Sequence, residues 1–106
     1  MERIKSELII AARLLEEIQN LKGNENEGAK KLVLSFLNAL QGETQMAYNV
    51  SREKNFEQAT MKVWEAAERT RSKEYGEAIR CVSEAISITT TSGQPALQLL
   101  KEKGLL

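Results

Sequence analysis

The sequence of 106 residues contains no histidine and no aspartate, and it has a single cysteine and a single proline. Without histidine, the protein has no imidazole general base, no Ser-His-Asp or Cys-His arrangement and no common set of zinc ligands. Fifteen glutamates supply all the acidic side chains, and they balance fifteen lysines and arginines to a formal net charge of zero. We therefore expect a protein that is not an enzyme and that uses no cofactor and no metal ion.

Signals for redox chemistry and for targeting are equally scarce. The one cysteine, Cys81, lies in an apolar stretch with helical spacing, where a thiol typically packs as an inert small hydrophobe. The sequence shows no N-terminal signal pattern and no apolar run of about 18 residues, the length that a membrane-spanning helix needs. These features predict a soluble, cytoplasmic protein that makes no membrane contact.

Apolar residues recur at helical spacing along the chain, and no segment alternates with the period of two typical of strands. Intervals of four and three predict a first helix near residues 2–21, at Ile4, Leu8, Ala11, Leu15 and Ile18. Residues 22–28 contain two glycines and two asparagines among polar neighbours, which predicts a loop. A second helix is expected from Ala29, and it continues through Gly42 because good helix formers follow that glycine.

Two more helices are predicted in the second half of the chain. The third carries an apolar stripe from Phe56 to Thr70, with Ser51 or Asn55 as its cap and with Asn55 and Gln58 spaced as a capping box. The fourth carries a stripe from Tyr75 to Thr89, and because only residues 72–74 intervene, these two helices should be antiparallel neighbours.

The end of the chain carries a second pair of helix signals. Gly93 is expected to stop the fourth helix, and Pro95 to begin a short helix that ends at Gly104. The sequence thus predicts an all-α fold, a four-helix antiparallel bundle with a short C-terminal helix, formed by residues 1–106 as a single domain.

Part of the second half resembles a single tetratricopeptide helical hairpin, over about residues 62–88. The resembling positions are residues 73–79, Val82, Ala85, Ile86 and Ile88. In that family, small residues at the positions of Ala78 and Ala85 let two helices approach, and an aromatic at the position of Tyr75 closes the turn. The upstream helix departs from the family, with Ala66 where glycine is usual and Arg69 where an aromatic is expected. Tetratricopeptide arrays need about three stacked repeats, and this pattern occurs once, so the resemblance implies a tight helix pair with a protein-binding role.

Glutamates three residues apart, Glu65 with Glu68 and Glu74 with Glu77, place carboxylates in pairs on helix faces. Similar pairs bind divalent metal in all-α nucleotide pyrophosphatases, where a downstream carboxylate pair contains aspartate. This chain has no aspartate, and basic residues stand between its glutamates. Surface ion pairs are therefore the better interpretation, and we expect no metal site.

The densest basic cluster surrounds the turn between the third and fourth helices. It consists of Lys62, Arg69, Arg71, Lys73 and Arg80. On one exposed face these residues would be candidate nucleic-acid contacts, because phosphate contacts dominate nucleic-acid affinity. The interleaved glutamates should cancel most of this positive field, so nucleic-acid binding is an alternative that we do not favour.

Several large apolar residues exceed the needs of one central core. A small domain buries only about 60% of its unfolded surface, and a two-fold dimer is the commonest way to cover a remaining apolar face. We therefore predict a homodimer through the first helix and the C-terminal leucines, with other protein partners also expected. The candidate interface residues are Ile9, Ile10, Leu14, Leu21, Trp64, Leu105 and Leu106.

These features together predict a non-enzymatic helical module for protein–protein interaction or assembly, one that associates with itself. The alternative is a small helical subunit of a nucleic-acid-binding complex, in which the basic turn contacts phosphate and the apolar surplus contacts neighbouring proteins.

Overall fold

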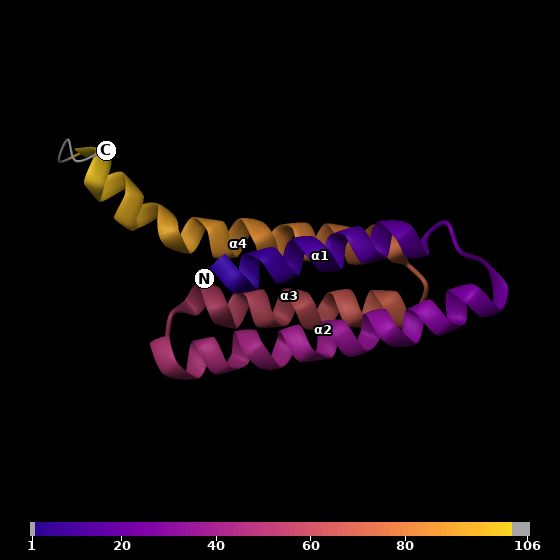
Figure 1. Ribbon diagram of the computed structural model, residues 1–106. Helices are drawn as coiled ribbons and strands as arrows, with labels where there is room; N and C mark the ends of the chain where they lie inside the picture. Colours follow the sequence, from indigo (N-terminus) through magenta and orange to yellow (C-terminus); the bar gives the residue numbers. More distant parts are fainter. Residues whose placement is uncertain (1, 103–106) are drawn as a thin grey trace.

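The computed structural model describes the backbone of residues 2–102 and the side chains of residues 3–90. It contains four helices: α1 (Glu2–Ile18), α2 (Gly23–Ser51), α3 (Lys54–Arg71) and α4 (Tyr75–Glu102). They form a ring in which α1 packs on α2, α2 on α3, α3 on α4 and α4 on α1, with consecutive helices antiparallel (Figure 1). The described residues form no strand, so the predicted all-α, four-helix antiparallel bundle is confirmed.

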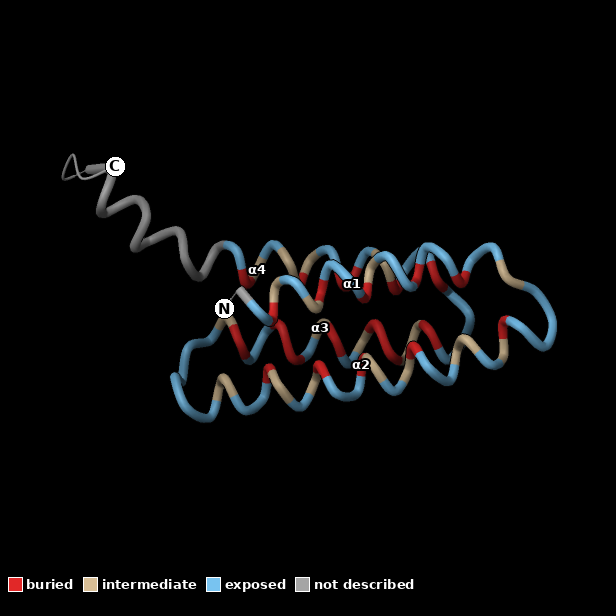
Figure 2. Tube along the Cα trace, viewed as in Figure 1, coloured by how far each residue is buried: buried red, intermediate tan, exposed pale blue. Residues whose placement is uncertain are grey.

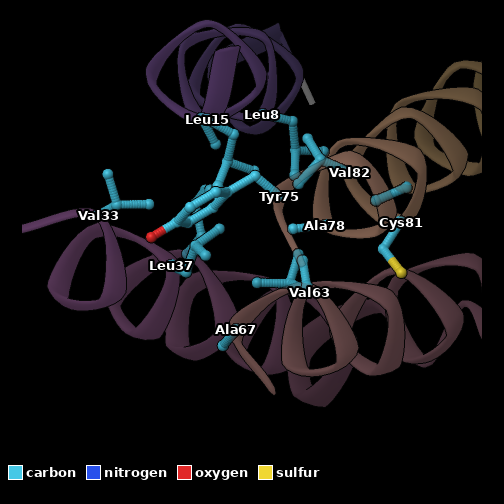
Figure 3. Close-up of a cluster of buried hydrophobic side chains, with 14 of the residues drawn as sticks. Leu8, Leu15, Val33, Leu37, Val63, Ala67, Tyr75, Ala78, Cys81 and Val82 are labelled. Carbon is cyan, nitrogen blue, oxygen red and sulfur yellow. The ribbon is translucent and has the colours of Figure 1, made fainter. Parts of the chain in front are cut away.

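The core lies along the axis of this ring. Buried residues recur on the inward side of all four helices, as Figure 2 shows, and on α1, α3 and α4 they follow the predicted apolar stripes. The predicted stripe of the second helix is only partly right, because Leu32, Met46 and Val50, which we expected in the same register as the buried Val33, Leu37 and Leu40, are exposed. Each helix contributes at least one completely buried side chain to this core (Figure 3): Leu8 from α1, Leu37 from α2, Val63 from α3 and Val82 from α4. Cys81 is also buried, and desolvation raises the pKa of its thiol, which keeps the sulfur protonated and unreactive.

Small residues line the contact between α3 and α4. Ala59 and Ala66 of α3 and Ala78 and Ala85 of α4 are completely buried, which lets the two backbones approach closely. Residues 72–74 connect the helices as predicted, and Lys73 adopts a left-handed conformation with φ of 61° in this turn. The predicted antiparallel pairing of α3 and α4 is therefore confirmed.

The predicted loop at residues 22–28 is wrong, because α2 already begins at Gly23. Gly23 has a φ of 61°, a conformation that glycine adopts without strain, and it reverses the chain after α1. The polar residues that suggested a loop form the first turns of α2, where Asn26 is buried. The Asn26 amide Nδ2 donates to the carbonyl oxygens of Ile18 and Leu21, at 3.2 Å each, and so satisfies the C-terminal end of α1.

The same asparagine also reaches the fourth helix. The Tyr75 hydroxyl donates to Asn26 Oδ1 at 2.9 Å, so one buried side chain joins the end of α1, the start of α2 and the start of α4. A buried amide is stable only when its donors and acceptors are paired, and this one is. Polar composition misled the sequence prediction because it does not reveal that a polar residue has buried partners.

Helix α2 passes through Gly42, as predicted, and ends at Ser51. Arg52 follows with φ of 61°, and its backbone N–H donates to the Tyr48 carbonyl at 2.7 Å, which is a left-handed helix cap. The predicted capping box of α3 is wrong: Glu53 is the N-cap and makes no side-chain capping bond. Asn55 lies inside α3 instead, and its Nδ2 donates to the Ile88 carbonyl of α4 at 3.4 Å.

The predicted stop at Gly93 does not occur. Residues 95–102, where a short C-terminal helix was expected, are helical, but they continue α4. A glycine weakens a helix by about 1 kcal/mol and a proline removes one backbone hydrogen bond, so each tends to weaken or bend a long helix without obliging it to end. Gly104, the expected end of that helix, lies outside the described residues.

Candidate interaction surface

One flank of α1 faces α2. Arg3, Glu7, Ile10 and Leu14 follow one another at intervals of four and three, which keeps their side chains on one side of the helix. Arg3 places this side against α2, because its Nη2 donates to Oε1 of Glu43 at 2.8 Å. Ile10 and Leu14 therefore lie along the edge where α1 meets α2.

The facing flank of α2 has the same spacing. Its members at intervals of four and three are Leu32, Phe36, Ala39, Glu43, Met46 and Val50. Glu43, which accepts the hydrogen bond from Arg3, orients this flank toward α1. The two helices thus bring two stripes of mainly apolar side chains to one side of the bundle.

Much of this apolar surface is open to solvent. The exposed fractions are 48% for Ile10, 37% for Leu14, 75% for Leu32, 68% for Met46 and 88% for Val50. We call these five residues the α1–α2 apolar face. They are five of the eight large apolar side chains exposed in the described part of the chain. Grouped apolar exposure of this kind marks interaction surfaces more often than scattered exposure does.

A charged cluster interrupts the α1–α2 apolar face. Arg3 bridges two carboxylates, with Nε 3.0 Å from Oε1 of Glu7 and Nη2 2.8 Å from Oε1 of Glu43. The second oxygen of Glu43, Oε2, has almost no contact with solvent and receives no hydrogen bond from any described donor. Beside the cluster lies a hollow of about 410 Å³, lined by Arg3, Ile4, Glu43 and Met46.

The two carboxyl groups perturb each other's protonation. Hydrogen bonding between them raises the pKa of Glu43, with burial adding to the rise, and it lowers the pKa of Glu7. Arg3 lowers the pKa of Glu7 further through its own hydrogen bond. Two ionised carboxylates have no hydrogen between them, so a hydrogen bond between Glu7 and Glu43 requires one proton on the pair.

The predicted interface residues of α1 lie at different places around the helix. Ile10 and Leu14 belong to the α1–α2 apolar face, whereas Ile9 is 42% exposed and lies about 200° around the helix from Glu7, away from α2. Leu21 is half-buried in the connection between α1 and α2. Of the four interface residues predicted in this region, only Ile10 and Leu14 therefore line the edge that α1 shares with α2.

Trp64 lies on another side of the bundle. It is 53% exposed on α3, next to Met61, which is 67% exposed, and the two line a shallow hollow of about 250 Å³. Helices α1 and α3 stand across the ring, and through their described residues their backbones are not neighbours. The structure thus separates Trp64 from the α1 residues, while Leu105 and Leu106 lie outside the described part of the chain.

The five basic residues near the α3–α4 turn all have acidic partners. The pairs are Lys62 with Glu84, Arg69 with Glu74, Arg71 with Glu68, Lys73 with Glu27, and Arg80 with Glu77. Exposed pairs of this kind contribute about 0–1 kcal/mol each to stability. Their main consequence is that the positive charge of the predicted cluster is compensated locally.

The glutamates that we considered as metal ligands belong to the same surface network. Glu68, Glu74 and Glu77 each pair with an arginine, and Glu65 lies 3.8 Å from the Lys62 ammonium. Among the residues that the structure describes, no three carboxylate, thiol or imidazole side chains gather closely enough to hold a metal ion.

Comparison with known proteins identifies no relative, because no family model, no curated protein and no solved structure matches the chain. No described helix is both long enough and apolar enough to cross a membrane. In the part of the chain that the structure describes, most of the large exposed apolar side chains lie on the α1–α2 apolar face.

Sequence analysis missed the α2 half of this face. Leu32, Met46 and Val50 were not among the candidate residues, although they recur in step with Phe36 and Glu43. The intervals of four and three were a usable signal, since α2 carries a second stripe beside its core stripe. Helix α2, with 29 residues, therefore carries apolar side chains beyond those that fill the core of the bundle.

Proposed function

We propose that the protein is a non-enzymatic helical interaction and assembly module that forms a homodimer through the α1–α2 apolar face. The observation that carries the proposal is the alignment of five exposed apolar side chains on two adjacent helices, with Leu32 75% and Val50 88% exposed. Covering these side chains releases ordered water, at a gain of about 25 cal/mol per Å² of apolar surface. A two-fold pairing lets each copy cover the face of the other.

The size of the face supports a dimer. From Leu32 to Val50, α2 extends about 27 Å at a rise of about 1.5 Å per residue, and two packed helices are about 20 Å wide. The footprint is on the order of 500 Å² per copy, or about 1,000 Å² for the pair, which is near the lower limit for a specific interface. We therefore expect micromolar rather than nanomolar affinity.

Charge supports a second copy as the partner. The chain has a formal net charge of zero, so two copies meet without long-range repulsion. Arg3 and Glu43 put both signs of charge beside the apolar residues, which suits a face that pairs with itself. The α3–α4 hairpin, which resembles a tetratricopeptide pair, leaves room for further protein partners on the opposite side. A cytoplasmic location without membrane contact remains part of the proposal.

The nucleic-acid alternative has less support. Phosphate binding requires uncompensated positive charge, and the pairing of Lys62, Arg69 and Arg80 with glutamates reduces it. A filter-binding assay at low salt with single-stranded and double-stranded RNA and DNA tests the alternative. We expect that the protein does not bind nucleic acid in this assay. Binding that weakens as salt is added, and that is lost in Arg69→Gln, would favour the alternative.

The dimer proposal is tested by light scattering on gel-filtered protein at 5–100 μM, a range chosen to bracket about 10 μM affinity. Wild-type protein should approach twice the chain mass of 11.9 kDa as its concentration rises. Leu32→Glu should stay monomeric, because it places a charge in the proposed interface. Met61→Glu is the matched control: it changes a similarly exposed apolar side chain on α3 and should associate like the wild type. A wild-type mass of one chain at every concentration would contradict the proposal.

A further inference from the structure

The cluster of Arg3, Glu7 and Glu43 has an unequal balance of charge. One guanidinium contacts two carboxylates, and the side chains of Glu7 and Glu43 are 23% and 31% exposed. Glu43 Oε2 is a buried acceptor with no donor, an arrangement that costs free energy unless something supplies a hydrogen. Arg3 holds the two carboxyl groups side by side, so a proton bound by the pair can supply that hydrogen.

We propose that Glu7 and Glu43 share one proton, and that this shared proton makes the docking of α1 on α2 dependent on pH. The second half of the inference concerns assembly and rests on the proposed function: because the pair interrupts the α1–α2 apolar face, self-association would bury it further. Removing water from two carboxylates favours the proton-bound state, so association should take up a proton and strengthen at mildly acidic pH.

The charged groups around the pair are few. Arg3 of α1 is the cation that contacts the carboxylates of Glu7 and Glu43. Helix α4 packs on the other flank of α1, and α3 packs on the other flank of α2, but none of their described charged side chains pairs with Glu7 or Glu43. Next to Glu43 on α2, the Thr44 hydroxyl accepts a hydrogen bond from the Thr60 hydroxyl of α3 at 2.8 Å. Neither hydroxyl titrates. The protonation of the pair therefore depends on the two carboxyls, Arg3 and burial.

The direction of the pH effect follows from the two shifts. Glu43 has a raised pKa in the folded protein, so protonating it adds stability as the pH falls through that value. Glu7 has a lowered pKa, so its contribution is present above its unfolded pKa and is lost as the pH falls through the lower, folded value. The folded state is thus favoured most between the two titrations, where the pair holds one proton.

The direct test is a pH titration of the glutamate side-chain carboxyl carbons by ¹³C NMR on the wild-type protein. We expect the pair to titrate in two separated steps, one above and one below the ordinary pKa of a glutamate side chain. In Glu43→Gln, which supplies amide hydrogens at every pH, Glu7 should titrate in a single step. If Glu7 and Glu43 titrate together at the ordinary glutamate pKa, the shared proton is refuted.

The link to assembly is tested by sedimentation equilibrium at pH 5.5 and 7.5. We expect the wild-type dimer to dissociate less at pH 5.5, and we expect this difference to disappear in Glu43→Gln but to persist in the control Glu16→Gln. A dissociation constant that does not change with pH in the wild type refutes the link. A two-step titration in a chain that stays monomeric would instead refute the proposed dimer while leaving the shared proton in place.

Discussion

The α3–α4 side and the α1–α2 side of the bundle are built from residues of different size. Four alanines of α3 and α4, Ala59, Ala66, Ala78 and Ala85, are completely buried, whereas the edge between α1 and α2 carries large side chains that remain exposed. Small residues let one helix pair complete its packing within the chain. Large residues at the edge of the other pair leave apolar surface that the chain does not cover, which is why we place self-association there.

The largest expected effect contrasts the two sides of α2. Leu37 points into the core and is 0% exposed, so Leu37→Ala should lower the free energy of unfolding by about 2–5 kcal/mol. Leu32→Ala removes the same atoms from an exposed position and should cost about 0.5 kcal/mol or less in the monomer. Urea unfolding at low protein concentration measures both. Equal losses would show that Leu32 is covered within one chain.

The next effect tests the close approach of α3 and α4. Ala78→Leu adds three carbons where a neighbouring helix lies in contact, and overpacking of this kind costs about 1–3 kcal/mol. Ala39→Leu is the control, because Ala39 is an exposed member of the α2 stripe. We expect it to leave monomer stability unchanged and to strengthen association. Thermal unfolding compares the two variants, and a tolerated Ala78→Leu would contradict the tight packing of this helix pair.

A further effect concerns the buried hydrogen bonds at the start of α2. Asn26→Ala removes the partner of the Tyr75 hydroxyl, the side-chain donor to the Leu21 carbonyl and one of two donors to the Ile18 carbonyl, and it should cost about 1–3 kcal/mol. Tyr75→Phe removes only one of the three bonds and should cost less. Urea unfolding of both variants measures the difference. A loss from Asn26→Ala no greater than that from Tyr75→Phe would show that the carbonyl contacts contribute nothing.

The fold could be predicted from sequence because its core residues recur at regular intervals. The stripes of Leu8, Val63 and Val82 require no knowledge of neighbours, and each is buried where periodicity placed it. The start of α2 could not be predicted, because Asn26 is buried through hydrogen bonds to residues 8 and 49 positions away. Such partners are set by the packing of three helices and leave no local pattern.

The candidate surface could be predicted only in part. Excess apolar residues on α1 drew attention to Ile10 and Leu14, but apolar character alone also grouped Trp64 with them, although α3 lies across the ring from α1. Which helices are neighbours decides which residues share a face. The same reason explains why the pair of Glu7 and Glu43, separated by 36 positions, has no signature in the sequence.

The most direct test of the central claim is an isotope-filtered NOE experiment on a mixture of labelled and unlabelled chains, which reports contacts only between copies. The account predicts intermolecular contacts that involve the methyl groups of Ile10, Leu14 and Leu32, and none that involve the methyl group of Met61. Intermolecular contacts confined to Met61 and Trp64, or no intermolecular contacts at concentrations of about 1 mM, would contradict it.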